Sequence, residues 1–151
     1  MSKLWQKNNK TAASVEQFTI GKDQQMDQYL AAYDVLGSIA HTTMLSEVGL
    51  LTKEEQVQLK KALIEIYVTI QAGDFELEEG VEDIHSQVEM LLTKKLGDIG
   101  KKIHSARSRN DQVLVDIKLF LRAEITKLSE SIQAFFTLLQ SKSEMHKTDL
   151  L

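Results

Sequence analysis

Apolar residues recur at steps of three and four along most of this 151-residue chain, the spacing of one face of an α-helix. The first such segment covers residues 23–48 and ends before Gly49, a natural left-handed helix stop. Gly37 lies inside it and predicts a close crossing with another helix, since glycine destabilises a helix interior. The stripe consists of Met26, Tyr29, Leu30, Tyr33, Leu36, Ala40, Met44 and Val48.

Two further helices are predicted before residue 100. Thr52 and Glu55 form a capping-box pattern that opens one of them, and Gly73 ends it. A polar, acidic connection leads to the next, residues 81–96, which stops at Gly97. The expected buried faces are Leu59, Leu63, Ile66, Tyr67 and Ile70 in the first and Ile84, Val88, Leu91 and Leu92 in the second.

The last part of the chain reads as one long helix, because residues 111–151 contain neither glycine nor proline and repeat apolar residues throughout. A helix of that length would span about 60 Å, too long for a small compact domain. It needs partners along its length, from other chains or from chain absent here. We therefore predict an all-α protein: a small helical domain, residues 1–109, and the first long helix of a truncated central helical bundle, residues 110–151.

Composition narrows the protein class. Hydrophobic residues make up 42% and charged residues 26%, close to a soluble globular average. The longest apolar runs are too short to span a membrane, and the first residues lack the apolar region of a secretory signal, so a cytoplasmic location is expected. The absence of cysteine excludes disulfides, thiolate metal sites and cysteine nucleophiles. The absence of proline favours long helices.

Charge is distributed unevenly. The net charge of −4 argues against a general nucleic-acid binder. Residues 62–93 hold eight acids and no lysine or arginine, whereas residues 94–109 hold six bases and one acid. Two interpretations stay open: the basic segment pairs with the acidic one, or it forms a positive site for an anion.

The segment with the most side chains able to bind a ligand is residues 105–112, S-A-R-S-R-N-D-Q, at the predicted start of the long helix. Unpaired N–H groups and the positive dipole end of a helix favour anions there. Arginine adds a planar fork that matches a carboxylate, and Ser and Asn add neutral donors. The alternative is structural: Asn110 or Asp111 caps the helix, and the arginines pair with the acidic residues 74–89.

Glu82 and His85 lie three residues apart, on one helix face. That spacing occurs in di-metal bundles, but those need two Glu-x-x-His copies and this chain has one. We expect neither a metal nor another cofactor. His85 either orients a substrate or forms a hydrogen bond within the structure.

Several of these segments resemble one known family. Residues 104–113, H-S-A-R-S-R-N-D-Q-V, resemble the H-T-G-R-S-R-N-D-Q-V segment of argininosuccinate lyases and the related δ-crystallins, of the fumarase/aspartase superfamily. Lys3-Leu4-Trp5 resembles the family's opening K-L-W, residues 33–41 its first helix, residues 49–52 its G-L-L-T turn and residues 82–85 its E-D-I-H segment. The resemblance covers essentially the whole chain in order.

The resemblance implies an all-helical homotetramer that cleaves argininosuccinate into arginine and fumarate by β-elimination, in cytoplasmic arginine biosynthesis. The small-molecule substrate is the expected ligand, with neither nucleic acid nor membrane as partner. Family residues that contact substrate match Ser108, Arg109 and Asn110, with His85 nearby and Asp27 near the same site.

Departures from the family pattern limit what this chain can do alone. Ser105-Ala106 replaces the usual Thr-Gly, and Gln6-Lys7-Asn8-Asn9 replaces G-G-R-F. The family's early substrate-contacting serine has no clean match. Its catalytic threonine–histidine segment and its G-S-S-x-M-P loop are absent from the 151 residues, so we expect no catalytic residue here and no lyase activity from the chain by itself. Alternatives are another dicarboxylate lyase, of the adenylosuccinate or aspartate type, and a non-catalytic crystallin-like or oligomerisation module.

Overall fold

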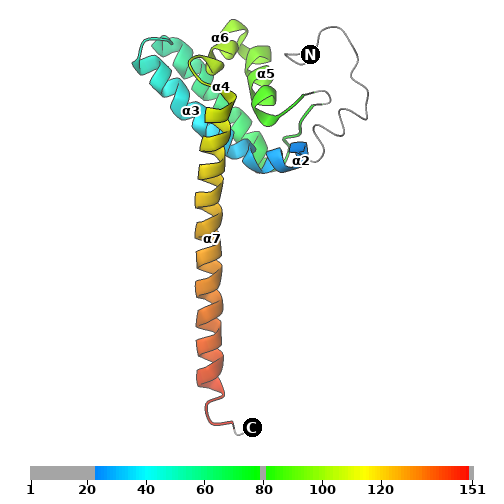
Figure 1. Cartoon of the computed structure of the whole chain (residues 1–151), viewed down its shortest axis with the longest axis vertical. Helices are drawn as coiled ribbons and strands as arrows, with labels where there is room; N and C mark the ends of the chain where they lie inside the picture. Colours follow the sequence, from blue (N-terminus) through cyan, green and yellow to red (C-terminus); the bar gives the residue numbers. More distant parts are fainter. Residues whose placement is uncertain (1–22, 79–80, 150–151) are drawn as a thin grey trace. The chain divides into compact units, whose positions relative to one another are not determined.

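The computed structural model describes residues 23–78 and 81–149. Every regular element within them is helical, which confirms the all-α prediction (Figure 1). The chain divides into two compact units, residues 1–117 and 118–151. The functional boundary predicted between residues 109 and 110 stays a prediction. The K-L-W and Gln6–Asn9 comparisons lie outside the described residues.

The first predicted helix is formed by α2 (Asp23–Asp27), the 3-10 helix η1 (Gln28–Leu30) and α3 (Ala31–Glu47). Gly49 follows with a φ of 80°, which confirms the expected left-handed stop. A Cβ on Gly37 would lie 3.2 Å from Cγ1 of Val115, so the predicted close crossing is confirmed, and it is with α7 (Arg109–Met145).

The buried face of α3 differs from the predicted stripe. Leu36, Met44 and Val48 are exposed, and small or polar residues occupy the buried side instead. Small side chains allow neighbouring helices to approach closely, and the polar ones find partners there, as shown below. The buried residues of α3 are Ala31, Asp34, Val35, Ser38, Thr42 and Leu45.

Helix α4 (Lys53–Ala72) matches its prediction at both ends. Thr52 and Glu55 form the capping box, in which the side chain of each accepts a hydrogen bond from the backbone N–H of the other. Gly73 closes the helix with a φ of 81°. Leu59 and Leu63 are fully buried, and Ile66, Tyr67 and Ile70 pack against the same core.

Helix α5 (Ile84–Leu96) begins three residues later than predicted. The reason is Asp83, whose carboxylate accepts a hydrogen bond of 2.7 Å from the backbone N–H of Ser86 and so caps the helix. Gly97 ends it as expected. Ile84, Val88 and Leu92 are buried, which confirms most of the predicted face.

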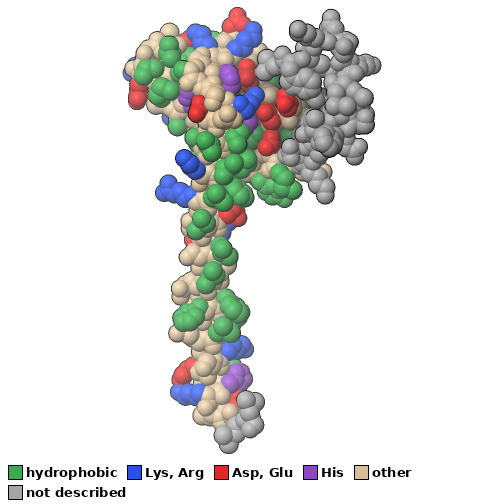
Figure 2. Space-filling view, in the orientation of Figure 1, with side chains coloured by type: hydrophobic (Ala, Val, Ile, Leu, Met, Phe, Trp, Pro, Cys, Tyr) green, Lys and Arg blue, Asp and Glu red, His purple; other side chains and the backbone are tan. Residues whose placement is uncertain are grey.

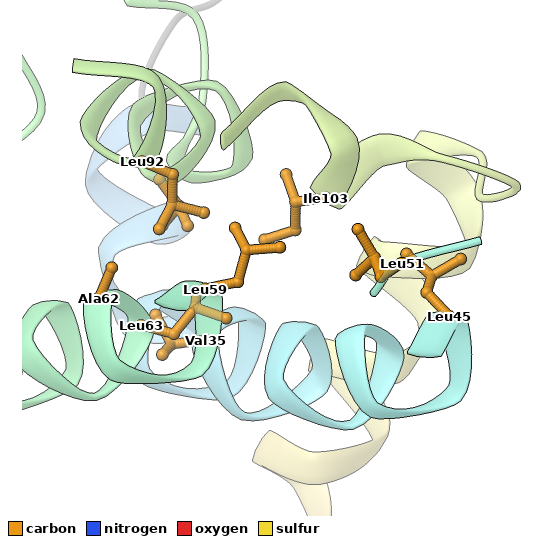
Figure 3. Close-up of a cluster of buried hydrophobic side chains, with 9 residues drawn as sticks. Val35, Leu45, Leu51, Leu59, Ala62, Leu63, Leu92 and Ile103 are labelled. Atoms are coloured by element: carbon orange, nitrogen blue, oxygen red, sulfur yellow. The ribbon is translucent and has the colours of Figure 1, made fainter. Parts of the chain in front are cut away.

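The hydrophobic core lies between α3, α4 and α5 and extends to η2 (Lys102–His104) (Figure 3). Helix α6 (Asp98–Lys101) connects α5 to η2, and Ile103 of η2 closes one side of the core. This core holds α3, α5 and the loop before α7 together, and these elements carry the site described next. Its buried members are Val35, Leu45, Leu51, Leu59, Ala62, Leu63, Val88, Leu92 and Ile103.

Helix α7 contains 37 residues and ends at Met145, short of the expected continuation to residue 151. Beyond the first compact unit, most of the apolar residues that recur along α7 are exposed and form a stripe (Figure 2). In the described part of the chain, every helix is too short or too polar to cross a membrane. The exposed members of the stripe after residue 117 are Leu121, Ile125, Leu128, Ile132, Phe135, Phe136 and Leu139.

Candidate functional site

Ser108 caps α7. Its Oγ accepts a hydrogen bond of 3.2 Å from the backbone N–H of Asp111, and its own N–H donates to Oδ2 of Asp111 at 2.9 Å. These bonds from Ser108 hold the pKa of the Asp111 carboxyl below its ordinary value. The cap is therefore Ser108 with Asp111, and Ser108 lies two residues before the predicted cap Asn110. The predicted substrate contact of Ser108 stays a prediction.

Arg109 lies on the first turn of α7 and reaches the beginning of α5. One terminal nitrogen donates to Oγ of Ser86 at 3.1 Å and the other to Oε1 of Gln112 at 3.4 Å. Its Nε lies 3.3 Å from Oδ2 of Asp83, which confirms for this arginine the predicted pairing with the acidic segment. A guanidinium has five N–H groups, so with respect to the described residues one N–H on each terminal nitrogen is left for a ligand.

Arg107 serves a structural purpose. Both of its terminal nitrogens donate to Oγ of Ser38, at 3.3 and 3.2 Å, and one also donates to the backbone oxygen of Ile103 at 3.4 Å. Burial lowers the pKa of its guanidinium, and the negative charges of Asp34 and Asp116 act in the opposite direction. Arg107 thus ties the loop before α7 to α3.

Asn110 is exposed on the first turn of α7. Its side chain makes no hydrogen bond with the described residues, so its amide can contact a ligand. The position is favourable for an anion, because the first turn of a helix has N–H groups without intrahelical partners and the positive end of the dipole.

His85 is buried in a polar cluster that joins three helices. Its Nδ1 lies 2.9 Å from Oδ1 of Asp34 on α3 and 3.7 Å from Oδ2 of Asp116 on α7. The amide nitrogen of Gln112 donates to the same Oδ1 of Asp34 at 3.3 Å. The structure therefore shows the second of the two predicted alternatives for His85, a hydrogen bond within the fold. Its contact with substrate stays a prediction.

Burial raises the pKa of Asp116 to about 7, and the negative charge of Asp34 adds to the effect. The negative charge of Asp27 on α2 also raises the pKa of Asp116. The predicted position of Asp27 near the substrate stays a prediction. Burial lowers the pKa of His85, but the hydrogen bond and charge of Asp34 outweigh it, and the net direction is upward. The raised pKa values of Asp116 and His85 both favour the protonated forms of these two groups.

Asp34, His85 and Asp116 offer ligand atoms within 4.8 Å of one another, and by residue type they could hold a divalent cation. Three features oppose this. Nδ1 of His85 is already engaged with Asp34, and the positive charge of Arg107 acts on both carboxylates. The raised pKa of Asp116 also favours its neutral form, which would carry less negative charge toward a cation. The expected absence of a metal stays a prediction.

The loop before α7 is fixed by His41 of α3, whose Nε2 lies 2.9 Å from the backbone oxygen of Ser105. Burial lowers the pKa of His41, which favours its neutral form. The next residue, Ala106, has a φ of 55°, in the left-handed region that favours glycine. The loop that leads into Arg109 and Asn110 is therefore ordered by contacts and carries local strain.

Comparison with known proteins shows which family the chain belongs to. Residues 2–151 match a family described as lyase. The chain belongs to this lyase family. It is 54% identical over 149 residues to an argininosuccinate lyase of Bacteroides fragilis and 56% identical over 149 residues to one of Parabacteroides distasonis. An argininosuccinate lyase of Thermotoga neapolitana is 43% identical over 130 residues, 86% of the chain.

The Bacteroides and Parabacteroides alignments cover 99% of this lyase-family chain but 33% of each relative. The chain therefore spans about a third of the length of the curated relatives that it matches.

Sequence reasoning missed the polar partners inside this lyase-family domain: Asp34, Asp116 and Gln112. A usable signal existed, since Asp34, Ser38 and Thr42 recur every four residues on α3, and Gln112 and Asp116 are four apart on α7. Such polar stripes are ordinarily read as solvent-facing. Only the fold shows that Asp34 on α3 contacts Gln112 on α7.

Proposed function

We propose that this chain forms the substrate-binding amino-terminal part of an argininosuccinate lyase, which cleaves argininosuccinate to arginine and fumarate. The observation that carries the proposal is that Arg109 and Asn110 both lie on the first turn of α7. Arg109 contacts Asp83, Ser86 and Gln112, the described residues leave one N–H on each of its terminal nitrogens without a partner, and the neighbouring Asn110 is exposed.

These groups suit the succinyl end of the substrate. β-Elimination removes a proton next to a carboxylate, and negative charge spreads into that carboxylate before the carbon–nitrogen bond breaks. Donors that are already in place when the charge develops lower the barrier without reorganisation. We assign this work to Arg109, Asn110 and the first-turn N–H groups of α7, and we assign proton transfer to groups outside the 151 residues.

We further propose that α7 associates with other copies of the chain in a cytoplasmic homotetramer of arginine biosynthesis. Support comes from the exposed apolar stripe between Leu121 and Leu139, because a long apolar face in water favours association.

The experiment is a chimera in which this chain replaces the corresponding third of the Bacteroides fragilis argininosuccinate lyase, assayed for fumarate release. The chimera is expected to be active and the chain alone inactive. Asn110→Ala is expected to lower kcat/KM by about 100-fold, as loss of a donor to a developing charge does. Gln58→Ala, which removes an exposed amide on α4, is the matched control and leaves kcat/KM unchanged. Full activity of the Asn110→Ala chimera contradicts the proposal.

A further inference from the structure

Gln112 connects a buried carboxylate to a partly exposed guanidinium. Its side chain is buried on α7, three residues after Arg109 and thus on the same helix face. The amide nitrogen donates to Oδ1 of Asp34 at 3.3 Å, and the amide oxygen accepts from Arg109 at 3.4 Å. Both ends of one amide are therefore used, one toward the interior and one toward the candidate site.

The buried end fixes which way the amide points. Asp34 is 1% exposed on α3, and its Oδ1 also contacts Nδ1 of His85 on α5. A carboxylate in this position accepts, so the donor end of Gln112 faces it and the acceptor end faces Arg109. With the amide reversed, its N–H groups would oppose those of the guanidinium, and its oxygen would oppose the carboxylate.

The other contacts of Arg109 with described residues come from the N-cap and the first turn of α5. Asp83 and Ser86 both lie at the start of that helix and draw the guanidinium toward it. Among the described residues, Gln112 is the partner that holds the other terminal nitrogen from the side of α7. It therefore sets the orientation of the guanidinium plane and, with it, the direction of the two remaining N–H groups.

We propose that Gln112 is a positioning residue for Arg109: it uses the fixed carboxylate of Asp34 to aim the guanidinium at the carboxylate of the substrate. The benefit to binding rests on the proposed function of Arg109, whereas the orientation itself is a property of this chain. A long flexible side chain that is aimed beforehand loses less conformational entropy when the ligand binds.

NMR of the Arg109 side chain tests this proposal directly. The chain has three arginines, Arg107, Arg109 and Arg122, so the guanidinium Nε–Hε signals can be assigned by substitution. Gln112→Met keeps the length of the side chain and removes both hydrogen bonds. The Arg109 Nε–Hε signal is expected to shift and its solvent exchange to speed up about tenfold, as an ordered contact is lost. Gln112→Asn, which keeps an amide but shortens its reach, is expected to act in the same direction and serves if the Met variant folds poorly.

Gln87→Met is the matched control. Gln87 is also a buried glutamine, and its amide bonds Glu78 instead of Arg109. It is expected to lower stability while leaving the Arg109 signal unchanged. An unchanged Arg109 signal in both Gln112 variants, or the same change in Gln87→Met, overturns the positioning role.

The chimera described above separates this inference from the proposed function. There Gln112→Met is expected to raise KM for argininosuccinate about tenfold, with kcat changed less, because a group that binds substrate is misaligned. If Gln112→Met changes the Arg109 NMR signal but leaves the KM of the chimera unchanged, Gln112 does not orient Arg109 toward the substrate. A chimera that lacks lyase activity before any substitution rejects the proposed function and leaves the NMR result to decide the orientation.

Discussion

Nδ1 of His85 lies 2.9 Å from Oδ1 of Asp34, and this buried contact joins α5 to α3. Asp116 extends the cluster to α7, so this buried cluster of three polar side chains links the three helices around the candidate site. Two oxygens, Oδ2 of Asp34 and Oδ2 of Asp116, have no hydrogen-bond partner among the described residues. Leaving buried oxygens unpaired destabilises a fold, and protonation of one of them relieves part of that cost.

Stability is expected to depend on pH through Asp116. Its pKa in the folded chain is about 7, above the ordinary 3.8, so the folded state binds more protons than the unfolded state between these values. The stabilising contribution is therefore present at low pH and is lost as the pH rises toward 7. His85, whose pKa is also raised, acts in the same direction, and Asp34, Arg107 and Asp27 are the other charges that face Asp116.

Urea denaturation of the wild-type chain and Asp116→Asn at pH 5 and pH 8 checks this. Between these pH values the wild type is expected to lose about 2 kcal/mol relative to the variant, a fraction of the full shift because solvent and neighbours screen the group. Asp98→Asn, at an exposed carboxylate, is the control and should keep the wild-type pH dependence. Parallel pH profiles for wild type and Asp116→Asn would show that Asp116 carries an ordinary pKa.

Removing the helix cap is expected to destabilise the chain without disturbing the core. Ser108→Ala removes the Oγ that accepts from Asp111 and should lower the free energy of unfolding by about 1 kcal/mol. Asn110→Ala, at an exposed side chain two residues later, should change it by less than about 0.5 kcal/mol. Equal losses in the two variants would contradict the assignment of Ser108 as the cap.

Ala106 offers a stabilising substitution. Its φ of 55° is unfavourable for a residue with a Cβ, so Ala106→Gly is expected to raise the free energy of unfolding by about 0.5–1 kcal/mol. The same change at Ala134, in the interior of α7, should lower it by up to about 1 kcal/mol. Opposite signs in thermal denaturation of the two variants support the strained loop, and a loss at both positions argues against it.

The exposed stripe on α7 predicts concentration-dependent association. Sedimentation equilibrium of the chain is expected to show species larger than a monomer. The double substitution Ile125→Glu and Ile132→Glu should shift the population to monomer, because each charge would be buried in the interface. Glu substitutions at Thr126 and Gln133, each one position further along α7, provide the control. A wild-type chain that stays monomeric at high concentration would remove the support for self-association.

Much of the fold was predictable because its signals are local. The Thr52 and Glu55 cap, the glycine stops and the face of α4 depend on residues within one or two turns of each other. Two predictions were wrong for different reasons. The buried face of α3 depends on Asp34, whose partners His85 and Gln112 lie 51 and 78 positions away in the sequence. The start of α5 depends on Asp83, whose partner is the N–H of Ser86 three residues later, a local capping signal that apolar spacing does not contain.

The sequence alone determined the helices, their principal stops, and the lyase family through the segment around Arg109 and Asn110. Tertiary structure decided which polar residues are buried and what each charged group faces. Gln112 meets Asp34 across 78 positions of sequence, and Arg109 meets Ser86 across 23. Helical periodicity arises from neighbouring residues on one element, whereas hydrogen bonds and pKa values depend on distances between elements, which exist only once the core has packed.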